Sequence, residues 1–193
     1  PVYRGFFLNI FVLLMNEHRE ILNSTQLDII IKRLSQELIE SHQDFSHSVI
    51  VSLQPRGKYL ASRLISCLSE NFNLTSISSG DLDISFYRDD LLTKKSPIIP
   101  EKINMDISTE NKRVILVDDV LFTARSVRAA MDAIMPFGRP QSIELLVLID
   151  RRFSRHIPIQ PNYVGKIVDA IDSERVVVDW KKNNVLILKE KNE

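Results

Sequence analysis

The stretch Val114–Ser126, VILVDDVLFTARS, decides the fold of this chain. Four β-prone apolar residues lead into two adjacent carboxylates, Asp118 and Asp119, and a short hydroxyl-rich loop follows them. The next residues, SVRAAMDAIM, carry apolar side chains three and four positions apart, which predicts a helix. A strand, an acidic pair, a loop and a helix in this order place the loop at the carboxyl end of a strand. Open α/β sheets bind their ligands at that edge.

The loop and the acidic pair suit different parts of one ligand. Backbone N–H groups of a turn, together with the start of a helix, favour a phosphate. The carboxylates cannot bind phosphate directly, so we expect them to face sugar hydroxyls or a magnesium ion. A receiver domain is one alternative, but its acidic pair lies near the start of the domain. Here the pair lies more than a hundred residues into the chain. The other alternative is a solvated turn that only caps the helix.

These residues resemble the phosphoribosyl-pyrophosphate (PRPP) motif of type I phosphoribosyltransferases. The longer stretch VDDVLFTARSVRAAMDA resembles the bacterial pyrimidine-operon regulator/uracil phosphoribosyltransferase (PyrR) family. The resemblance runs from about Ile21 to about Glu190 and implies an α/β fold, with a mainly parallel central sheet flanked by helices, a small hood and a C-terminal β-hairpin. Five further stretches agree with the family in the same order: RGKYLASRL (56–64), DLDISFYRDDL (81–91), FGRP (137–140), VLIDRR (147–152) and PNYVGK (161–166).

Length and composition fit one ordinary globular domain. The chain has 193 residues, and its 25 basic and 25 acidic side chains cancel, so no global charge indicates nucleic acid or a membrane. An RNA-binding face would therefore be a local patch. The only cysteine, Cys67, excludes an internal disulfide and shares a helical face with three leucines, so we expect it to be buried.

The first fourteen residues differ from the rest. They contain the apolar run FFLNIFVLL, which is too short to span a bilayer and lacks a signal-peptide cleavage site. We expect residues 1–14 to come from upstream translation or an expression vector, and residues 15–193 to form the phosphoribosyltransferase domain. A membrane-surface anchor and an arm that packs in an oligomer are the alternatives.

Periodicity predicts the remaining elements. Asn23, Ser24 and Thr25 indicate the start of a helix that reaches about Ser41, with Asp28 as capping partner. Residues 88–107 are polar and aperiodic, which is typical of a functional loop. Strands are expected at 48–53, 74–79, 82–87, 142–149 and within 157–168, a helix at 58–72, and a closing hairpin at 175–180 and 185–189.

The segment that follows the strand at 48–53 offers a second loop for the ligand. Gly57 permits close backbone approach or a positive φ, and Arg56 supplies charged donors for a diphosphate. A simple Pro-Gly turn with a surface arginine is the alternative. The resemblance assigns Pro55, Arg56 and Gly57 to the pyrophosphate loop.

The resemblance also assigns the other site residues. It gives Asp118 and Asp119 to the ribose hydroxyls and, indirectly, to a magnesium ion bound by PRPP. A flexible loop begins at Tyr87, Arg88 and Asp89, which anchor it or take part in catalysis. The phosphate loop comprises Val120, Leu121, Phe122, Thr123, Ala124, Arg125 and Ser126, and the base pocket comprises Asp150, Arg151 and backbone near Val164.

Three parts of the sequence depart from the family pattern. A glycine is usual where this chain has Ala124, and a DRGHRELP-like stretch is usual where it reads DRRFSRHIP. The first helix keeps Lys32 and Arg33, but Gln36 and Ser41 stand where RNA-binding members usually have His and Arg. This last departure weakens the case for RNA binding more than the case for catalysis.

The resemblance therefore predicts a cytoplasmic enzyme, not associated with a membrane, that converts uracil and PRPP to UMP and pyrophosphate with Mg²⁺. We expect a homo-oligomer, a dimer or larger. Two alternatives remain open: a UMP-responsive RNA-binding regulator of pyrimidine genes with little catalysis, and a phosphoribosyltransferase for another base.

Overall fold

The computed structural model describes residues 18–85, 87 and 107–189. The chain divides into two units. The main unit is Asp28–Asp169, and the second combines the two ends of the chain, up to Leu27 and from Ala170 onwards. The predicted extension at residues 1–14 lies outside the described residues, as do Arg88 and Asp89.

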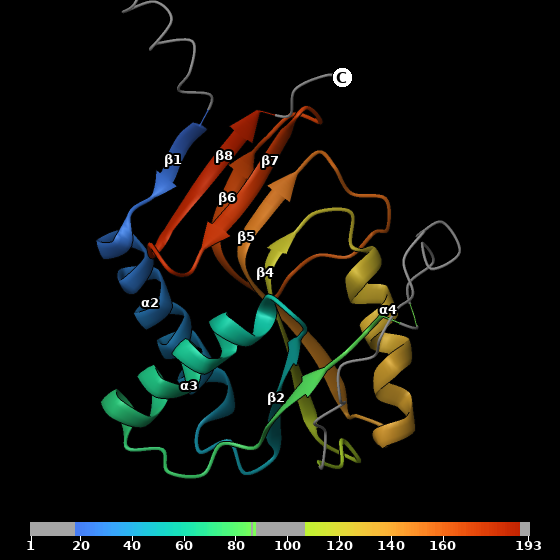
Figure 1. Cartoon of the computed structure of the whole chain (residues 1–193). Helices are drawn as coiled ribbons and strands as arrows, with labels where there is room; N and C mark the ends of the chain where they lie inside the picture. The colour runs from blue at the N-terminus through green and yellow to red at the C-terminus, as the bar shows by residue number, and fades with distance from the viewer. Residues whose placement is uncertain (1–17, 86, 88–106, 190–193) are drawn as a thin grey trace, which may run out of the picture. The chain divides into compact units, whose positions relative to one another are not determined.

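The main unit is built on a five-stranded sheet in which each strand runs parallel to its neighbours, as expected from the sequence. Two helices, α2 (Ser24–His42) and α3 (Gly57–Phe72), lie on one side of it, and α4 (Arg125–Ile134) lies on the other (Figure 1). In spatial order the strands are β3 (Ser79–Leu82), β2 (Ser48–Leu53), β4 (Arg113–Leu121), β5 (Ser142–Arg152) and β6 (Tyr163–Asp169).

Apolar side chains cover both faces of this sheet. Val51, Leu116 and Val147 pack with α4 in one core cluster. Their neighbours Ile50 and Ile115 are equally buried, and alternate residues of a strand point to opposite faces. Burial on both faces explains why these strands appear in the sequence as continuous apolar runs.

The bounds of three strands differ from the sequence prediction. The prediction of two strands, at 74–79 and 82–87, was wrong: the chain forms the single strand β3, which includes Gly80 and Asp81. The Asp81 carboxylate accepts a hydrogen bond from Ser52 Oγ at 2.6 Å, which fixes this residue beside β2. β4 and β5 are longer than expected and contain the polar residues that were predicted to follow them.

The second unit contains a three-stranded antiparallel sheet in the order β1-β8-β7. The predicted hairpin is confirmed as β7 (Glu174–Asp179) and β8 (Asn184–Lys189), and the sequence did not predict its partner β1 (His18–Leu22). The cap of α2 also differs from the prediction. Asn23 N donates to Gln26 Oε1 at 3.1 Å and Gln26 N donates to Asn23 Oδ1 at 3.0 Å, so Gln26 takes the capping role expected of Asp28.

Two further observations concern the helices. Cys67 is buried in α3, as predicted. Among the helices of the described ranges, none is both long and apolar enough to cross a membrane.

Candidate active site

The acidic pair lies inside β4, close to the carboxyl edge of the sheet. Asp118 is partly buried, and its Oδ1 accepts a hydrogen bond from Asp119 N at 2.9 Å. Asp119 is only 3% exposed, and its Oδ2 has no hydrogen-bond partner among the described residues. A buried carboxylate oxygen without a donor is costly, so this atom suits a hydroxyl or a cation supplied by a ligand.

The electrostatics of the pair support this reading. Burial, and then the neighbouring charge of Asp119, raise the pKa of Asp118 to about 8. Burial also raises the pKa of Asp119, while the positive charge of Arg56 opposes the rise at both carboxyls. The pair therefore retains a proton near neutral pH, and a bound cation would favour its release.

The predicted pyrophosphate loop lies directly against β4. Arg56 is exposed at the start of α3, and its charge reaches the acidic pair. Gly57 is buried, and a Cβ at this position would lie 2.2 Å from the Val117 carbonyl oxygen and 3.3 Å from Asp118 Cα. Close backbone approach, rather than a positive φ, is therefore what requires glycine here.

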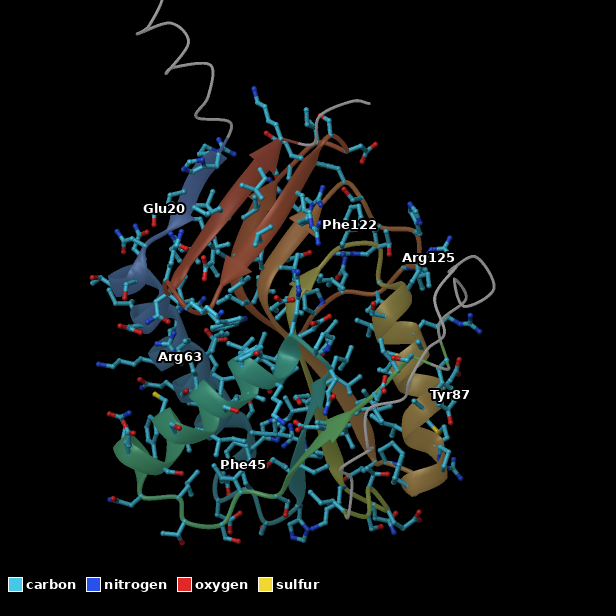
Figure 2. All side chains as sticks on the ribbon, in the orientation of Figure 1. Glu20, Phe45, Arg63, Tyr87, Phe122 and Arg125 are labelled. Carbon is cyan, nitrogen blue, oxygen red and sulfur yellow. The ribbon has the colours of Figure 1, made fainter. Side chains whose placement is uncertain are left out.

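The predicted phosphate loop joins β4 to α4, and Figure 2 labels Phe122 and Arg125 on it. Val120 and Leu121 still belong to the strand, and Ser126 belongs to the first turn of the helix. The first N–H groups of a helix have no acceptor within it and can bind an anion. Ala124, the N-cap residue, has φ 69° and ψ 6°, so this alanine adopts the left-handed conformation that glycine prefers.

Two of the three predicted base-pocket residues lie beside this loop. Asp150 pairs with Leu121 across the parallel strands. Arg151 is 4% exposed, and its guanidinium carbon lies 4.1 Å from the centroid of the Phe122 ring, a cation–π contact. The acidic pair, the phosphate loop and these two residues therefore share one edge of the sheet.

The structure does not bring Val164 to the same place. It pairs with Val147, three residues before Asp150, and its carbonyl oxygen accepts a hydrogen bond from Arg33 Nη2 at 2.8 Å. The residue of β6 that lies level with Asp150 is Ile167. The family resemblance, not the strand pattern, assigned backbone near Val164 to the base pocket, and that assignment remains a prediction.

The two predicted RNA contacts lie on α2. The Arg33 guanidinium also donates to the Gly165 carbonyl at 2.7 Å and pairs with Glu37, so it already has partners within the fold. Lys32 lines a groove of about 340 Å³ between α2 and α3. Tyr87 is exposed and closes a turn by donating its N–H to the Ile84 carbonyl at 3.0 Å. RNA binding and a role for Tyr87 remain predictions.

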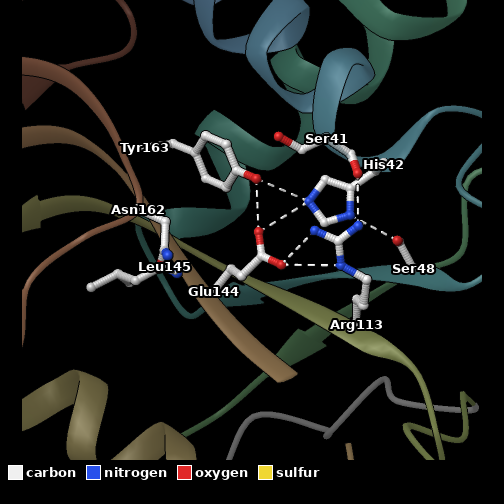
Figure 3. Close-up of polar contacts among 8 residues, drawn as sticks. All are labelled: Ser41, His42, Ser48, Arg113, Glu144, Leu145, Asn162 and Tyr163. Atoms are coloured by element: carbon white, nitrogen blue, oxygen red, sulfur yellow. Dashed lines mark hydrogen bonds and ion pairs between the residues drawn. The ribbon is translucent and has the colours of Figure 1, made fainter. Parts of the chain in front are cut away.

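The opposite edge of the sheet carries a polar network that the sequence did not predict (Figure 3). The His42 side chain is fully buried, with Nδ1 2.8 Å from Ser48 Oγ and Nε2 3.3 Å from Glu144 Oε2. Glu144 also accepts hydrogen bonds from Tyr163 OH at 2.7 Å and Arg113 Nη2 at 2.8 Å. One signal was available, because His42 continues the apolar stripe of α2 four residues after Leu38.

Comparison with known proteins identifies the class that this fold and site define. A model of the phosphoribosyl transferase domain family matches residues 18–182. The solved hypoxanthine phosphoribosyltransferase of Staphylococcus aureus superimposes with a TM-score of 0.68 and 23% identity, over 91% of this chain and 96% of that one. The Trypanosoma cruzi enzyme gives 0.68 and 17%, over 90% and 97%. The chain is a type I phosphoribosyltransferase, a pentosyltransferase.

Similar proteins that have been named identify the family within this class. Proteins named "Bifunctional protein PyrR" are 43% identical in Mannheimia succiniciproducens, 41% in Desulfosudis oleivorans and 40% in Bacillus subtilis. Each match covers 84–85% of this chain and 90–91% of the relative. The chain therefore belongs to the PyrR family of type I phosphoribosyltransferases, as the sequence motifs predicted.

Proposed function

We propose that the protein transfers the phosphoribosyl group of PRPP to uracil, forming UMP and pyrophosphate. One observation carries the proposal. The buried Asp119 carboxylate, whose Oδ2 has no partner among the described residues, lies near the end of β4, and a loop of backbone N–H donors follows directly. The loop suits a 5′-phosphate, and the carboxylate suits ribose hydroxyls. The choice of uracil rests on membership of the PyrR family, because the described geometry does not distinguish uracil from another base.

The proposed reaction replaces pyrophosphate at C1 of ribose by a ring nitrogen of the base. Positive charge develops on the ribose ring and negative charge on the departing diphosphate, so positioning and electrostatics dominate catalysis. In this proposal Asp118 and Asp119 hold the ribose hydroxyls and favour the cationic ring. Residues 122–126 hold the 5′-phosphate through backbone N–H groups, and Arg56 contacts the diphosphate.

The residues present also fit a magnesium ion that arrives with PRPP. The described residues contain no group of three or more His, Cys, Asp or Glu side chains that could hold a metal alone. Asp118 and Asp119 offer hard oxygen ligands, and Mg²⁺ commonly uses one or two carboxylates with substrate phosphates and waters. When bound, the ion would stabilise negative charge on the diphosphate.

Pyrophosphate release tests the proposal. The protein is incubated with PRPP, Mg²⁺ and each nucleobase in turn, and the rate is measured for each. We expect uracil to give the highest kcat/KM. A clear preference for hypoxanthine or guanine would contradict the assignment of the base, and no release with any base would contradict the proposed reaction.

A second candidate, UMP-responsive binding of pyrimidine-operon RNA, draws support from the "bifunctional" relatives. The engagement of Arg33 with β6 argues for weak binding. Phosphate contacts make such binding strongly salt-dependent, so titration of a leader RNA at two salt concentrations, with and without UMP, tests it. Tight, salt-sensitive binding that UMP enhances would establish the second function.

Three further predictions do not concern the reaction or RNA binding. A cytoplasmic location and a homo-oligomeric state remain predictions. We also propose that residues 1–14 do not belong to the domain, so their deletion should leave folding and activity intact. Loss of solubility or of an oligomer on deletion would show that they do belong.

A further inference from the structure

Residues Arg155–Ile157, which we call the bracing segment, hold the carbonyl side of the phosphate loop. Arg155 Nη1 donates to the Phe122 carbonyl oxygen. His156 N and Ile157 N both donate to the Thr123 carbonyl oxygen, at 3.1 and 3.3 Å. Two consecutive carbonyls of the phosphate loop are thus fixed by one short segment.

These contacts determine where the N–H groups of the loop point. In a trans peptide the C=O and the N–H of one unit point in opposite directions. The units whose carbonyls face the bracing segment carry the N–H groups of Thr123 and Ala124, so both N–H groups face away from it. The Ala124 carbonyl accepts Arg128 N at 3.0 Å inside α4, which directs the Arg125 N–H out of the start of the helix, where it makes one long contact, 3.5 Å, with Thr123 Oγ1. Successive N–H groups around a left-handed residue make an anion-binding concavity.

Arg155 has a second contact, on the base side of the site. Its Nη2 pairs with Asp150 Oδ1, and the two side chains are only 22% and 13% exposed. One guanidinium therefore joins the phosphate loop to the carboxylate expected to face the base. Its planar fork of donors suits two acceptors in fixed positions better than a lysine would.

We propose that Arg155 is a positioning residue that aims the phosphate loop and couples it to the base side through Asp150. The inference rests on the proposed PRPP site, and it assigns Arg155 no contact with the substrate. Arg155 and His156 lie within the stretch DRRFSRHIP.

The neighbouring Arg152 is a matched control. It lies in the same stretch, is 52% exposed, and donates to both carboxylate oxygens of Asp169, at 2.6 and 2.7 Å. Arg152→Met removes the same charge and the same number of side-chain bonds as Arg155→Met, but it leaves the phosphate loop untouched.

Calorimetric titration of PRPP in Mg²⁺ tests the inference. We expect Arg155→Met to weaken PRPP binding about tenfold, the change that one lost hydrogen-bond-sized interaction produces. Arg155→Lys should recover part of the loss, and Arg152→Met should stay within about twofold of wild type. In steady-state assays the KM for PRPP should rise in Arg155→Met with little change in kcat, because PRPP binding is the step impaired.

The coupling itself is tested with Asp150→Asn. This substitution is on the base side, yet it should also weaken PRPP binding measured without any base. The double variant Asp150→Asn/Arg155→Met should bind PRPP no more weakly than Arg155→Met alone, because both changes remove the same ion pair between Asp150 and Arg155. Additive losses would overturn the coupling.

The outcomes separate this inference from the proposed function. Unchanged PRPP affinity in Arg155→Met, or equal losses in Arg155→Met and Arg152→Met, would overturn the inference while PRPP binding stands. A wild-type protein that does not bind PRPP would overturn both. Weakened binding in Arg155→Met supports the inference even if the base proves not to be uracil. Thermal unfolding confirms that each variant is folded, and if Arg155→Met is not, the comparison of Arg155→Lys with Arg152→Lys decides.

Discussion

The two edges of the parallel sheet bury charged side chains in opposite ways. At the amino edge, the Glu144 carboxylate is held by Arg113, Tyr163 and the buried His42 (Figure 3). At the carboxyl edge, Asp118 and Asp119 lie side by side, and one oxygen of Asp119 has no partner among the described residues.

We infer from this difference that the network at the amino edge stabilises the fold, whereas the acidic pair at the carboxyl edge binds a ligand. A buried ionic network with all its partners fixes elements relative to one another, and its loss costs stability. Two adjacent carboxylates with raised pKa values destabilise the folded protein and persist where a ligand supplies the missing charge. Substitutions at the two edges should therefore have opposite effects on stability and on activity.

The largest effect is expected at the acidic pair. Asp118→Asn combined with Asp119→Asn should lower kcat/KM at least ~1000-fold, because the ribose hydroxyls and the cationic ring lose both carboxylates. Pyrophosphate release measures the loss, and circular dichroism confirms the fold. Turnover close to wild type would show that the pair has no part in the reaction.

The next largest effect is expected at the opposite edge. Glu144→Ala removes the carboxylate shared by Arg113, Tyr163 and His42, and leaving buried polar groups without this partner costs about 1–3 kcal/mol of unfolding free energy. Chemical denaturation measures the cost. The control is Glu37→Ala, which removes a pair in which Glu37 is 35% exposed and should cost less than ~1 kcal/mol. Equal losses in the two variants would contradict the distinction between the edges.

The pH dependence of stability should distinguish the edges by sign. Asp118 has its pKa raised from 3.8 to about 8, so the folded state binds more protons there and stability falls as pH rises through this window. Burial lowers the pKa of His42 below 6.5 despite the opposing charge of Glu144. The contribution of neutral His42 to stability is therefore lost as pH falls below 6.5. In unfolding curves recorded from pH 4 to 9, the double Asn variant should lose the fall in stability between about pH 4 and 8, and His42→Asn should lose the opposite change, the fall in stability below pH 6.5. Unchanged slopes would contradict the assignments.

The smallest effect is expected at Ala124. Its left-handed conformation costs alanine roughly 1–2 kcal/mol, so Ala124→Gly should stabilise the protein by up to about 1 kcal/mol and tighten PRPP binding by up to about tenfold. Calorimetry and thermal unfolding measure the two changes. The control Ala129→Gly lies within α4, where glycine should destabilise by about 0.5–1 kcal/mol. Weaker PRPP binding in Ala124→Gly would show that the alanine suits the loop.

The carboxyl edge was predictable because local sequence defines it. β4 leads into its loop and α4 within a single apolar-to-helical pattern, and Gly57 follows β2 closely. β1 was missed because three of its five residues are exposed and polar, and it joins β8 through main-chain pairing. The amino-edge network was missed because its members come from five separate elements, and each alone resembles a surface residue.

The contacts of Arg155 could not be predicted either. They depend on how the residues after β5 return to the phosphate loop, a geometry that neither periodicity nor composition determines. The register between β5 and β6, which pairs Val164 with Val147 and Ile167 with Asp150, likewise cannot be read from periodicity.

Thermal unfolding with and without Mg²⁺ and PRPP tests most directly whether the acidic pair is held for a ligand. At neutral pH and without ligand, the double Asn variant should melt ~2–6 °C above wild type, a gain of about 1–2 kcal/mol, because asparagine needs no proton uptake on folding whereas the buried carboxyl pair does. Saturating Mg²⁺ and PRPP should raise the melting temperature of wild type, since a ligand that binds only the folded state stabilises it, and should not raise that of the variant. A variant that melts below wild type without ligand, or that gains as much from PRPP, would contradict the proposed role of Asp118 and Asp119.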